Sequence, residues 1–239
     1  MRLRVLEQGV IEAQDAVFVT EEGETELVNA TWPVRCYLVE HPNGLLLWDA
    51  GLPEGSPENP PPAGKFPKGI RQPLVPWLAG LGIAPADLTY MGFSHLHNDH
   101  AGNANHFAAA TVVVGAREWD HAFGPAPGPV YRPQDYAALR ESRTILVEET
   151  HDLFGDGAIV IRAAPGHTPG HQILLLTMPG EAQPLLLVGD AFYAPEDRTH
   201  RRIPVWNVDT AQSFRTIDRI EHLAAQTGAR LLVHHDPKA

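Results

Sequence analysis

The chain has 239 residues, of which 44% are hydrophobic and 20% charged, a composition typical of globular rather than disordered proteins. This length fits one domain spanning residues 1–239. The 18 Lys and Arg against 29 Asp and Glu give a formal net charge of −11, which disfavours binding to nucleic acids and anionic membranes. A single cysteine, Cys36, excludes a disulfide framework and a cysteine-based zinc site within the chain.

The sequence contains no recognisable targeting or membrane segment. The opening residues MRLRVLEQGV lack the apolar core of a signal peptide, and no stretch reaches about 18 consecutive apolar residues. We therefore expect a cytoplasmic protein without a membrane partner.

The first third of the chain reads as short strands followed by an irregular segment. Apolar runs predict strands at 2–10, 16–20, 34–40 and 45–51. His41-Pro42-Asn43-Gly44 is a turn signal, so the last two of these strands are expected to form a hairpin. Residues 52–76 contain eight prolines, and we expect no regular structure there. This Pro-rich segment is longer than an ordinary connection, which favours a functional loop or an assembly surface.

The remainder of the chain combines helices with buried strands. Short helices are expected at 75–82 and 116–123, and a longer one at 209–227 with Gly228 as its stop. Continuous apolar runs predict strands at 88–94, 111–115, 145–149, 158–164, 172–178 and 184–190. Two β-rich halves with flanking helices predict an α+β fold in which two sheets pack face to face with helices outside.

A histidine-rich motif directly follows the predicted strand 88–94. Residues 94–100 read SHLHNDH, which places three histidines and an aspartate within six residues. His95 and His97 would project to the same side of an extended segment, and Asp99 and His100 would reach the same space from the turn that follows. Imidazole nitrogens and carboxylate oxygens are ligands that divalent transition metals prefer. We interpret this motif as a metal-binding loop rather than a chance polar turn.

Further candidate ligands stand at the ends of later apolar strands. Each is weak evidence alone, because a lone histidine at a strand end is commonly a solvated residue. Strands that deliver polar groups at their ends are nevertheless how a rigid scaffold builds a site. Together the residues suffice for two divalent metals: His95, His97 and His167 for one, Asp99, His100 and either His234 or His235 for the other, with Asp190 able to bridge them.

These motifs resemble the metallo-β-lactamase superfamily and, within it, are most similar to the N-acyl-homoserine lactonases. The similarity extends over nearly the whole chain. Matches beyond the ligands are PVRCYL at 33–38, DAG at 49–51, SHLHNDHAGN at 94–103, PGHTPGHQ at 165–172 and GDAFY at 189–193. The resemblance implies a four-layer αββα sandwich with two metal ions at one edge of its sheets.

The resemblance also implies roles for individual residues. His235 rather than His234 would be the terminal ligand, because it precedes Asp236 as in the family's His-Asp pair. Tyr193 matches the active-site tyrosine of the lactonases. Asp49, a turn residue after a predicted strand, would support the site from behind.

The implied reaction is hydrolysis of a lactone ring. Two cations lower the pKa of a shared water, so that hydroxide is available near neutral pH to attack the lactone carbonyl. The Tyr193 hydroxyl would help to stabilise the developing oxyanion, and Asp99 would carry a proton to the leaving ring alkoxide. Zinc is the metal we expect, and the same ligands also accept cobalt, manganese or iron.

Other functions share these ligands. A lactonase for another ring, such as γ-butyrolactone or the pyridoxine-catabolic lactone, and a broad arylesterase would use the same metal chemistry, so the ligands do not separate them. True β-lactamases of the superfamily commonly carry Cys or Ser where this chain has Asp190. A non-enzymatic structural zinc site would be closed by four protein ligands, fewer than this chain offers.

Two further hypotheses concern the function of the Pro-rich segment. Phe66, Leu74 and the neighbouring Trp77 could form an apolar rim that accepts an acyl chain, or they could be buried in a homodimer. The partners expected from the sequence are therefore a small-molecule lactone and a second copy of the chain, with no nucleic acid and no membrane.

Overall fold

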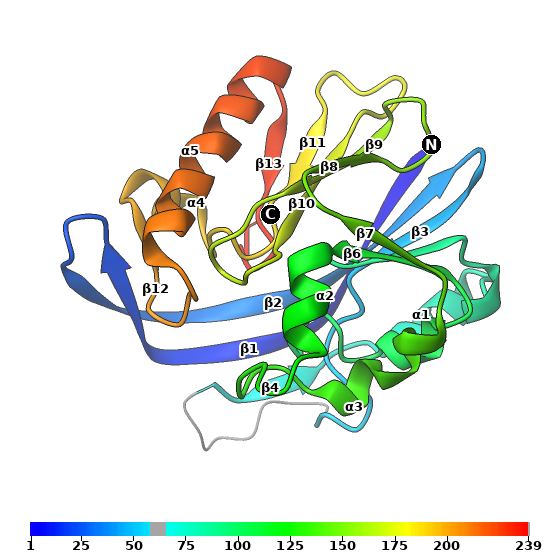
Figure 1. Ribbon diagram of the computed structural model, residues 1–239, viewed down its shortest axis with the longest axis horizontal. Helices are drawn as coiled ribbons and strands as arrows, with labels where there is room; N and C mark the ends of the chain where they lie inside the picture. Colours follow the sequence, from blue (N-terminus) through cyan, green and yellow to red (C-terminus); the bar gives the residue numbers. More distant parts are fainter. Residues whose placement is uncertain (58–65, 239) are drawn as a thin grey trace.

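Two β-sheets form the centre of the molecule (Figure 1). The computed structural model describes residues 1–57 and 66–238, so the middle of the Pro-rich segment lies outside the described residues. The helix α5 covers the outer face of one sheet, and α1, α2 and α3 lie on the far side of the other. These layers confirm the predicted αββα sandwich.

The larger sheet has eight strands in the order β12-β1-β2-β3-β5-β6-β7, with β4 paired to β1. Strands β3, β5, β6 and β7 run parallel, and the pairs formed by β1 and β2 are antiparallel. The strands are β1 (Arg2–Thr20), β2 (Thr25–His41), β3 (Gly44–Trp48), β4 (Lys68–Ile70), β5 (Tyr90–Gly92), β6 (Thr111–Gly115), β7 (Thr144–Val147) and β12 (Arg202–Pro204).

The smaller sheet has five strands in the order β13-β11-β10-β9-β8. Strands β11 and β13 are parallel, whereas the other neighbouring pairs are antiparallel. The strands are β8 (Thr150–Asp152), β9 (Ile159–Ala163), β10 (Gln172–Leu176), β11 (Leu185–Leu187) and β13 (Arg230–Leu232).

Helices are short except for α5, whose ends are both capped. The Asp209 carboxylate accepts a hydrogen bond from the Gln212 backbone N–H at 2.8 Å, and Gly228 closes the helix with a left-handed φ of 67°. The α-helices are α1 (Leu74–Gly80), α2 (Ala116–Ala122), α3 (Pro133–Tyr136), α4 (Pro195–Thr199) and α5 (Thr210–Thr227), and the 3₁₀ turns are η1 (Pro85–Asp87), η2 (Ala104–Phe107) and η3 (Ala137–Glu141). Among the described residues, no helix combines the length and apolarity needed to cross a membrane.

Successive side chains of a strand point to opposite faces of the sheet, and this divides the hydrophobic core into layers. In β2, Tyr37 and Val39 face the space between the sheets, while Leu38 packs on the opposite side with residues of the helical layer. In β10, Leu174 faces the other sheet and Ile173 packs beneath α5. Burying a side chain of this size contributes roughly 1.5–3 kcal/mol, so both faces of each sheet help to fix its position.

Several predicted elements were wrong in their extent. The runs 2–10 and 16–20 belong to one strand, β1, whose alternation is broken by irregular register near Gly9 and Ala16. The strand predicted at 88–94 is only Tyr90–Gly92, because the following residues leave the sheet to form the histidine-rich loop.

The expectation that residues 52–76 lack regular structure was also wrong. Residues Lys68–Ile70 form β4, which pairs antiparallel with β1, because this stretch between prolines keeps its backbone N–H groups. Leu74 is 2% exposed in the core beneath the larger sheet, and Trp77 packs against that same core. These two residues therefore do not form the expected rim, and only Phe66 of the three lies at the candidate site.

Candidate metal centre

The candidate ligands meet at one edge of the sandwich, just beyond the ends of strands. The histidine-rich loop follows β5, Asp190 follows β11, and His235 follows β13. Strands β3 and β5 are parallel to each other, as are β11 and β13, so the carboxyl ends of each pair reach the same edge. His167 comes from the loop between β9 and β10.

One group of side chains contains three histidines. The ligand atoms of His95, His97 and His167 all lie within 4.8 Å of one another, and the three residues are buried. His167 Nε2 faces His97 Nδ1 at 3.2 Å. Asp190 Oδ2 lies 3.5 Å from His167 Nε2 and 4.0 Å from His95 Nε2.

The second group surrounds the other oxygen of the same aspartate. Asp190 Oδ1 lies 3.1 Å from His100 Nε2 and 3.3 Å from His235 Nε2. Asp99 Oδ2 is 3.9 Å from each of these two ring nitrogens. Asp190 therefore stands between the two groups and turns one oxygen toward each.

These atoms fit divalent metal ions. Within the described part of the chain, His95 Nε2, His100 Nε2, His235 Nε2 and Asp190 Oδ1 are buried and make no hydrogen bond. Leaving one buried polar atom unsatisfied costs roughly 1–3 kcal/mol, so four at one place indicate that a further group completes them. Neutral imidazole and carboxylate are the donors expected for a transition metal, and two cations would satisfy both groups.

Hydrogen bonds at the opposite nitrogen fix three of the rings. His235 Nδ1–H donates to the Pro33 carbonyl at 2.9 Å, and His167 Nδ1–H donates to the Asn207 side-chain oxygen at 2.8 Å. His100 Nδ1 lies 3.0 Å from Asp49 Oδ2. Each contact directs the Nε2 lone pair toward the centre and selects the tautomer that can bind a metal.

Asp49 lies behind the site, where the sequence placed it. This carboxylate is completely buried and accepts hydrogen bonds from the Ser94 backbone N–H at 2.7 Å and the Ser94 hydroxyl at 2.9 Å. Its backbone has a left-handed φ of 61°, a costly conformation for a residue other than glycine. The strained turn aims the carboxylate at His100 rather than along the strand.

His234 lies beside both the centre and this support, and its ligand atom is within 4.8 Å of those of His100 and His235. Its Nε2 accepts a hydrogen bond from the Arg35 backbone N–H at 3.2 Å, and its Nδ1 lies 3.8 Å from Asp49 Oδ2. By contrast, the neighbouring His235 directs Nε2 at Asp190. The two histidines left open by strand-end spacing thus occupy different surroundings.

Burial sets the protonation of the three rings in the first group. Burial lowers the pKa of His95, His97 and His167 below the ordinary histidine value, so these rings are neutral and offer lone pairs. Burial alone would raise the pKa of the Asp99 carboxyl, but the Lys68 ammonium and nearby rings outweigh it and hold this pKa well below its usual range. Asp99 is consequently ionised near neutral pH.

Tyr193 lies beside the centre with its ring stacked on His235 at 4.8 Å between ring centroids. The indole N–H of Trp206 donates to the Tyr193 hydroxyl at 3.4 Å. Burial, and then the charge of Asp190, raises the pKa of Tyr193 well above its usual value. The phenol therefore stays protonated and remains a hydrogen-bond donor.

A pocket of about 290 Å³ opens onto these groups. Its polar end includes Asp99, Asp190 and Tyr193. Its walls are mainly apolar and come from segments far apart in the sequence: Ile11, Trp32, Phe66, Val130 and Trp206. The pocket can therefore hold an apolar chain whose polar end reaches the metal centre.

Sequence reasoning missed one supporting residue, Asn207. Asn207 accepts from His167 and donates to the Ser213 hydroxyl at 2.9 Å, which connects the ligand loop to α5. His171, which the sequence placed either behind the ligands or packed in the sheet, accepts at Nε2 from the Asp190 backbone N–H at 3.0 Å. Asn207 belongs to none of the sequence motifs, so only its proximity in the fold identifies it.

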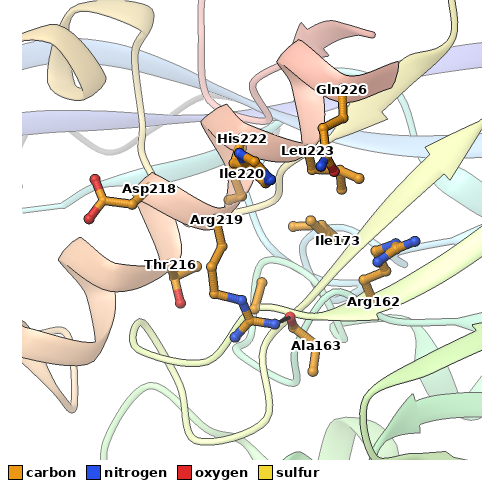
Figure 2. Close-up of a pocket in the computed structure, with 11 residues that line it drawn as sticks. Arg162, Ala163, Ile173, Thr216, Asp218, Arg219, Ile220, His222, Leu223 and Gln226 are labelled. Carbon is orange, nitrogen blue, oxygen red and sulfur yellow. Dashed lines mark hydrogen bonds between the residues drawn. The ribbon is translucent and has the colours of Figure 1, made fainter. Parts of the chain in front are cut away.

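A second pocket, of about 350 Å³, lies between α5 and strands β9 and β10 (Figure 2). Arg219 extends from the helix and donates to the Ala163 carbonyl at 3.3 Å. Ile173 and Leu223 line its apolar part, and His222 lies at its exposed side. Within the described residues, the three groups suited to a metal all lie at the other site.

Comparisons with known proteins agree with this architecture. Residues 30–235 match the family model described as the metallo-beta-lactamase superfamily. The N-acyl homoserine lactonase AttM of Azorhizobium caulinodans is 32% identical over 226 residues, covering 87% of this chain and 83% of the relative. An N-acyl homoserine lactonase from a Bacillus species is 31% identical over 217 residues, covering 85% and 81%.

A solved structure shares nearly the whole fold. It is a variant of AiiA from Bacillus thuringiensis with N-decanoyl-L-homoserine bound at the active site. The TM-score is 0.83 at 25% sequence identity, and the match covers 99% of this chain and 93% of that one.

Proposed function

Because this chain belongs to the metallo-beta-lactamase superfamily, we propose that it is a metal-dependent hydrolase that opens the lactone ring of N-acyl-homoserine lactones. One observation carries this proposal: the two oxygens of Asp190 face two separate ligand groups beside an apolar pocket. The names of the relatives at 32% and 31% identity support the choice of substrate.

The proposed ligands divide between two ions. His95, His97 and His167 would hold one, while Asp99, His100 and His235 would hold the other and Asp190 would contact both. We propose zinc at both positions, with cobalt, manganese or iron as ions that the same donors accept. When bound, two such ions polarise the lactone carbonyl and make hydroxide available near neutral pH.

Tyr193 is proposed to act on the lactone carbonyl. Its protonated hydroxyl lies in the wall of the pocket beside Asp190 and donates a hydrogen bond to the carbonyl oxygen as negative charge develops there. The stacking on His235 and the Trp206 contact hold the phenol in place before substrate arrives.

Asp99 is proposed to move the proton. Its Oδ2 faces His100 and His235, while its Oδ1 lies on the side of Lys68. An ionised carboxylate accepts a proton from the attacking water and can then return it to the ring oxygen that leaves as an alkoxide. This transfer completes ring opening and leaves the product as an N-acyl-homoserine carboxylate.

Proton release in weak buffer tests the proposal, because ring opening generates a carboxylic acid. The panel contains N-hexanoyl- and N-decanoyl-homoserine lactone, γ-butyrolactone and an aryl acetate, with chelated enzyme as the control. We expect rapid, chelator-sensitive opening of the acyl-homoserine lactones and slow turnover of the others. Hydrolysis of the simple lactone or the ester alone would replace the proposed substrate and leave the metal chemistry intact.

A further inference from the structure

A lysine and an asparagine form the polar side of the pocket away from the metal groups. Lys68 is the first residue of β4 and pairs with Ile11 of β1, so both side chains reach the pocket. Lys68 Nζ donates to Asn98 Oδ1 at 2.6 Å and lies 3.6 Å from Asp99 Oδ1. Asn98 has no role among the residues assigned above, and Lys68 has one only through its charge beside Asp99.

This contact fixes which way the Asn98 amide points. An ammonium group only donates hydrogen bonds, so the atom that faces Lys68 is the amide oxygen and the NH₂ group is turned away from the lysine. The Asn98 backbone is also held, because its N–H donates to the Val130 carbonyl at 3.0 Å. Asn98 and Val130 both line the pocket, so the oriented amide of Asn98 is part of the pocket wall.

The residues that line the pocket with Asn98 indicate which part of a substrate its amide would meet. Trp32, Phe66 and Trp206 supply apolar and aromatic wall, where an alkyl chain is stable. An N-acyl-homoserine lactone differs from a simple lactone by an amide group that joins the ring to such a chain. The amide carbonyl is an acceptor located between the reacting ring and the chain, and Asn98 stands in the chain between the candidate ligands His97 and Asp99 while lining the same pocket as the aromatic residues.

We propose that Asn98, oriented by Lys68, donates a hydrogen bond to the amide carbonyl of the N-acyl group and so selects N-acyl-homoserine lactones over lactones that lack an amide. Asn98 contacts the substrate in this arrangement, and Lys68 is a positioning residue. The inference rests on the proposed function and specifies how its substrate is distinguished from the alternative rings.

The test compares kcat/KM for N-hexanoyl-homoserine lactone and for γ-caprolactone, an alkyl lactone without an amide, using metal-loaded enzyme. For Asn98→Leu we expect the ratio of the two values to fall about tenfold, the effect of one lost neutral donor. Lys68→Met frees the amide to rotate and should lower the same ratio. Lys68→Arg retains a donor-only head group and should restore it.

Asn29→Leu is the matched control, since it makes the same chemical change at an exposed position of β2. Metal content is measured for every variant, so that a lost ion is not read as lost recognition. An unchanged ratio in Asn98→Leu, or equal losses on both substrates, would overturn the inference. Absence of any wild-type activity on the acyl lactone would instead overturn the proposed function, and the inference with it.

Discussion

The pocket under α5 and the pocket at the metal centre differ in chemistry more than in size. The pocket under α5 is the larger, at about 350 Å³ against 290 Å³ at the metal centre. Its Arg219 is already hydrogen-bonded to Ala163, and His222 lies exposed at its margin. At the metal centre, His95, His100 and His235 direct buried ring nitrogens toward Asp190, and these atoms make no hydrogen bond within the described chain. Converging lone pairs without partners, rather than the volume of a pocket, mark the site of chemistry.

This contrast is tested most severely by Asp190→Ala, for which we expect the largest effect. Removing the carboxylate takes away a contact from both ligand groups, so metal content after dialysis should fall below two equivalents per chain. The value of kcat/KM should fall by more than about 100-fold, beyond the loss typical of a residue that only supports a metal ligand. Retention of two equivalents would show that Asp190 does not bridge.

Tyr193→Phe should have the next largest effect. The variant keeps the stacked ring but loses the hydroxyl donor, so we expect a loss of transition-state stabilisation of about 1–3 kcal/mol in kcat/KM with metal content unchanged. Steady-state kinetics on an acyl-homoserine lactone measure it. Wild-type kinetics in this variant would remove Tyr193 from the mechanism.

Asn207→Ala probes the connection between the metal centre and α5. The His167 ring loses the acceptor of its Nδ1–H, and metal affinity should fall roughly 10–100-fold. Competition with a fluorescent chelator measures this affinity. Ser213→Ala removes a side chain one hydrogen bond further from the His167 ring. Metal affinity should fall less in this variant, because Asn207 keeps its contact with the ring. Equal affinities in wild type and Asn207→Ala would mean that the ring is held by packing alone.

The smallest effect is expected at the pocket under α5. His222→Ala and Gln226→Ala change exposed side chains there, and kcat/KM and metal content should both remain within about twofold of wild type. A large loss of activity in either variant would show that the larger pocket participates in the reaction, and the contrast between the two regions would no longer hold.

The histidine-rich loop was predictable because its information is local. A buried run followed immediately by SHLHNDH, and single ligands after later runs, are visible in the sequence without knowing how the strands pair. Strand-end spacing alone did not separate His234 from His235, since both follow the same strand, and only the resemblance to the lactonases favoured His235. The contacts that separate them, to Arg35 and Pro33, come from residues about 200 positions earlier.

The pocket was the least predictable part. Ile11, Trp32, Phe66 and Trp206 meet only because β1, β2 and the segments near β4 and β12 lie side by side, and none of them carries a chemical motif. The strand in the Pro-rich segment was missed for a similar reason. Proline content argued against a strand, but Lys68–Ile70 pair with β1. Tertiary contacts override local secondary-structure propensity where they supply the backbone hydrogen bonds.

Anomalous diffraction from crystals of the zinc-loaded protein tests the central claim most directly. We expect two peaks per chain, one against His95, His97 and His167 and one against Asp99, His100 and His235, with an oxygen of Asp190 on each. A single peak, or a second ion held by His234 in place of His235, would contradict the two-ion centre described here.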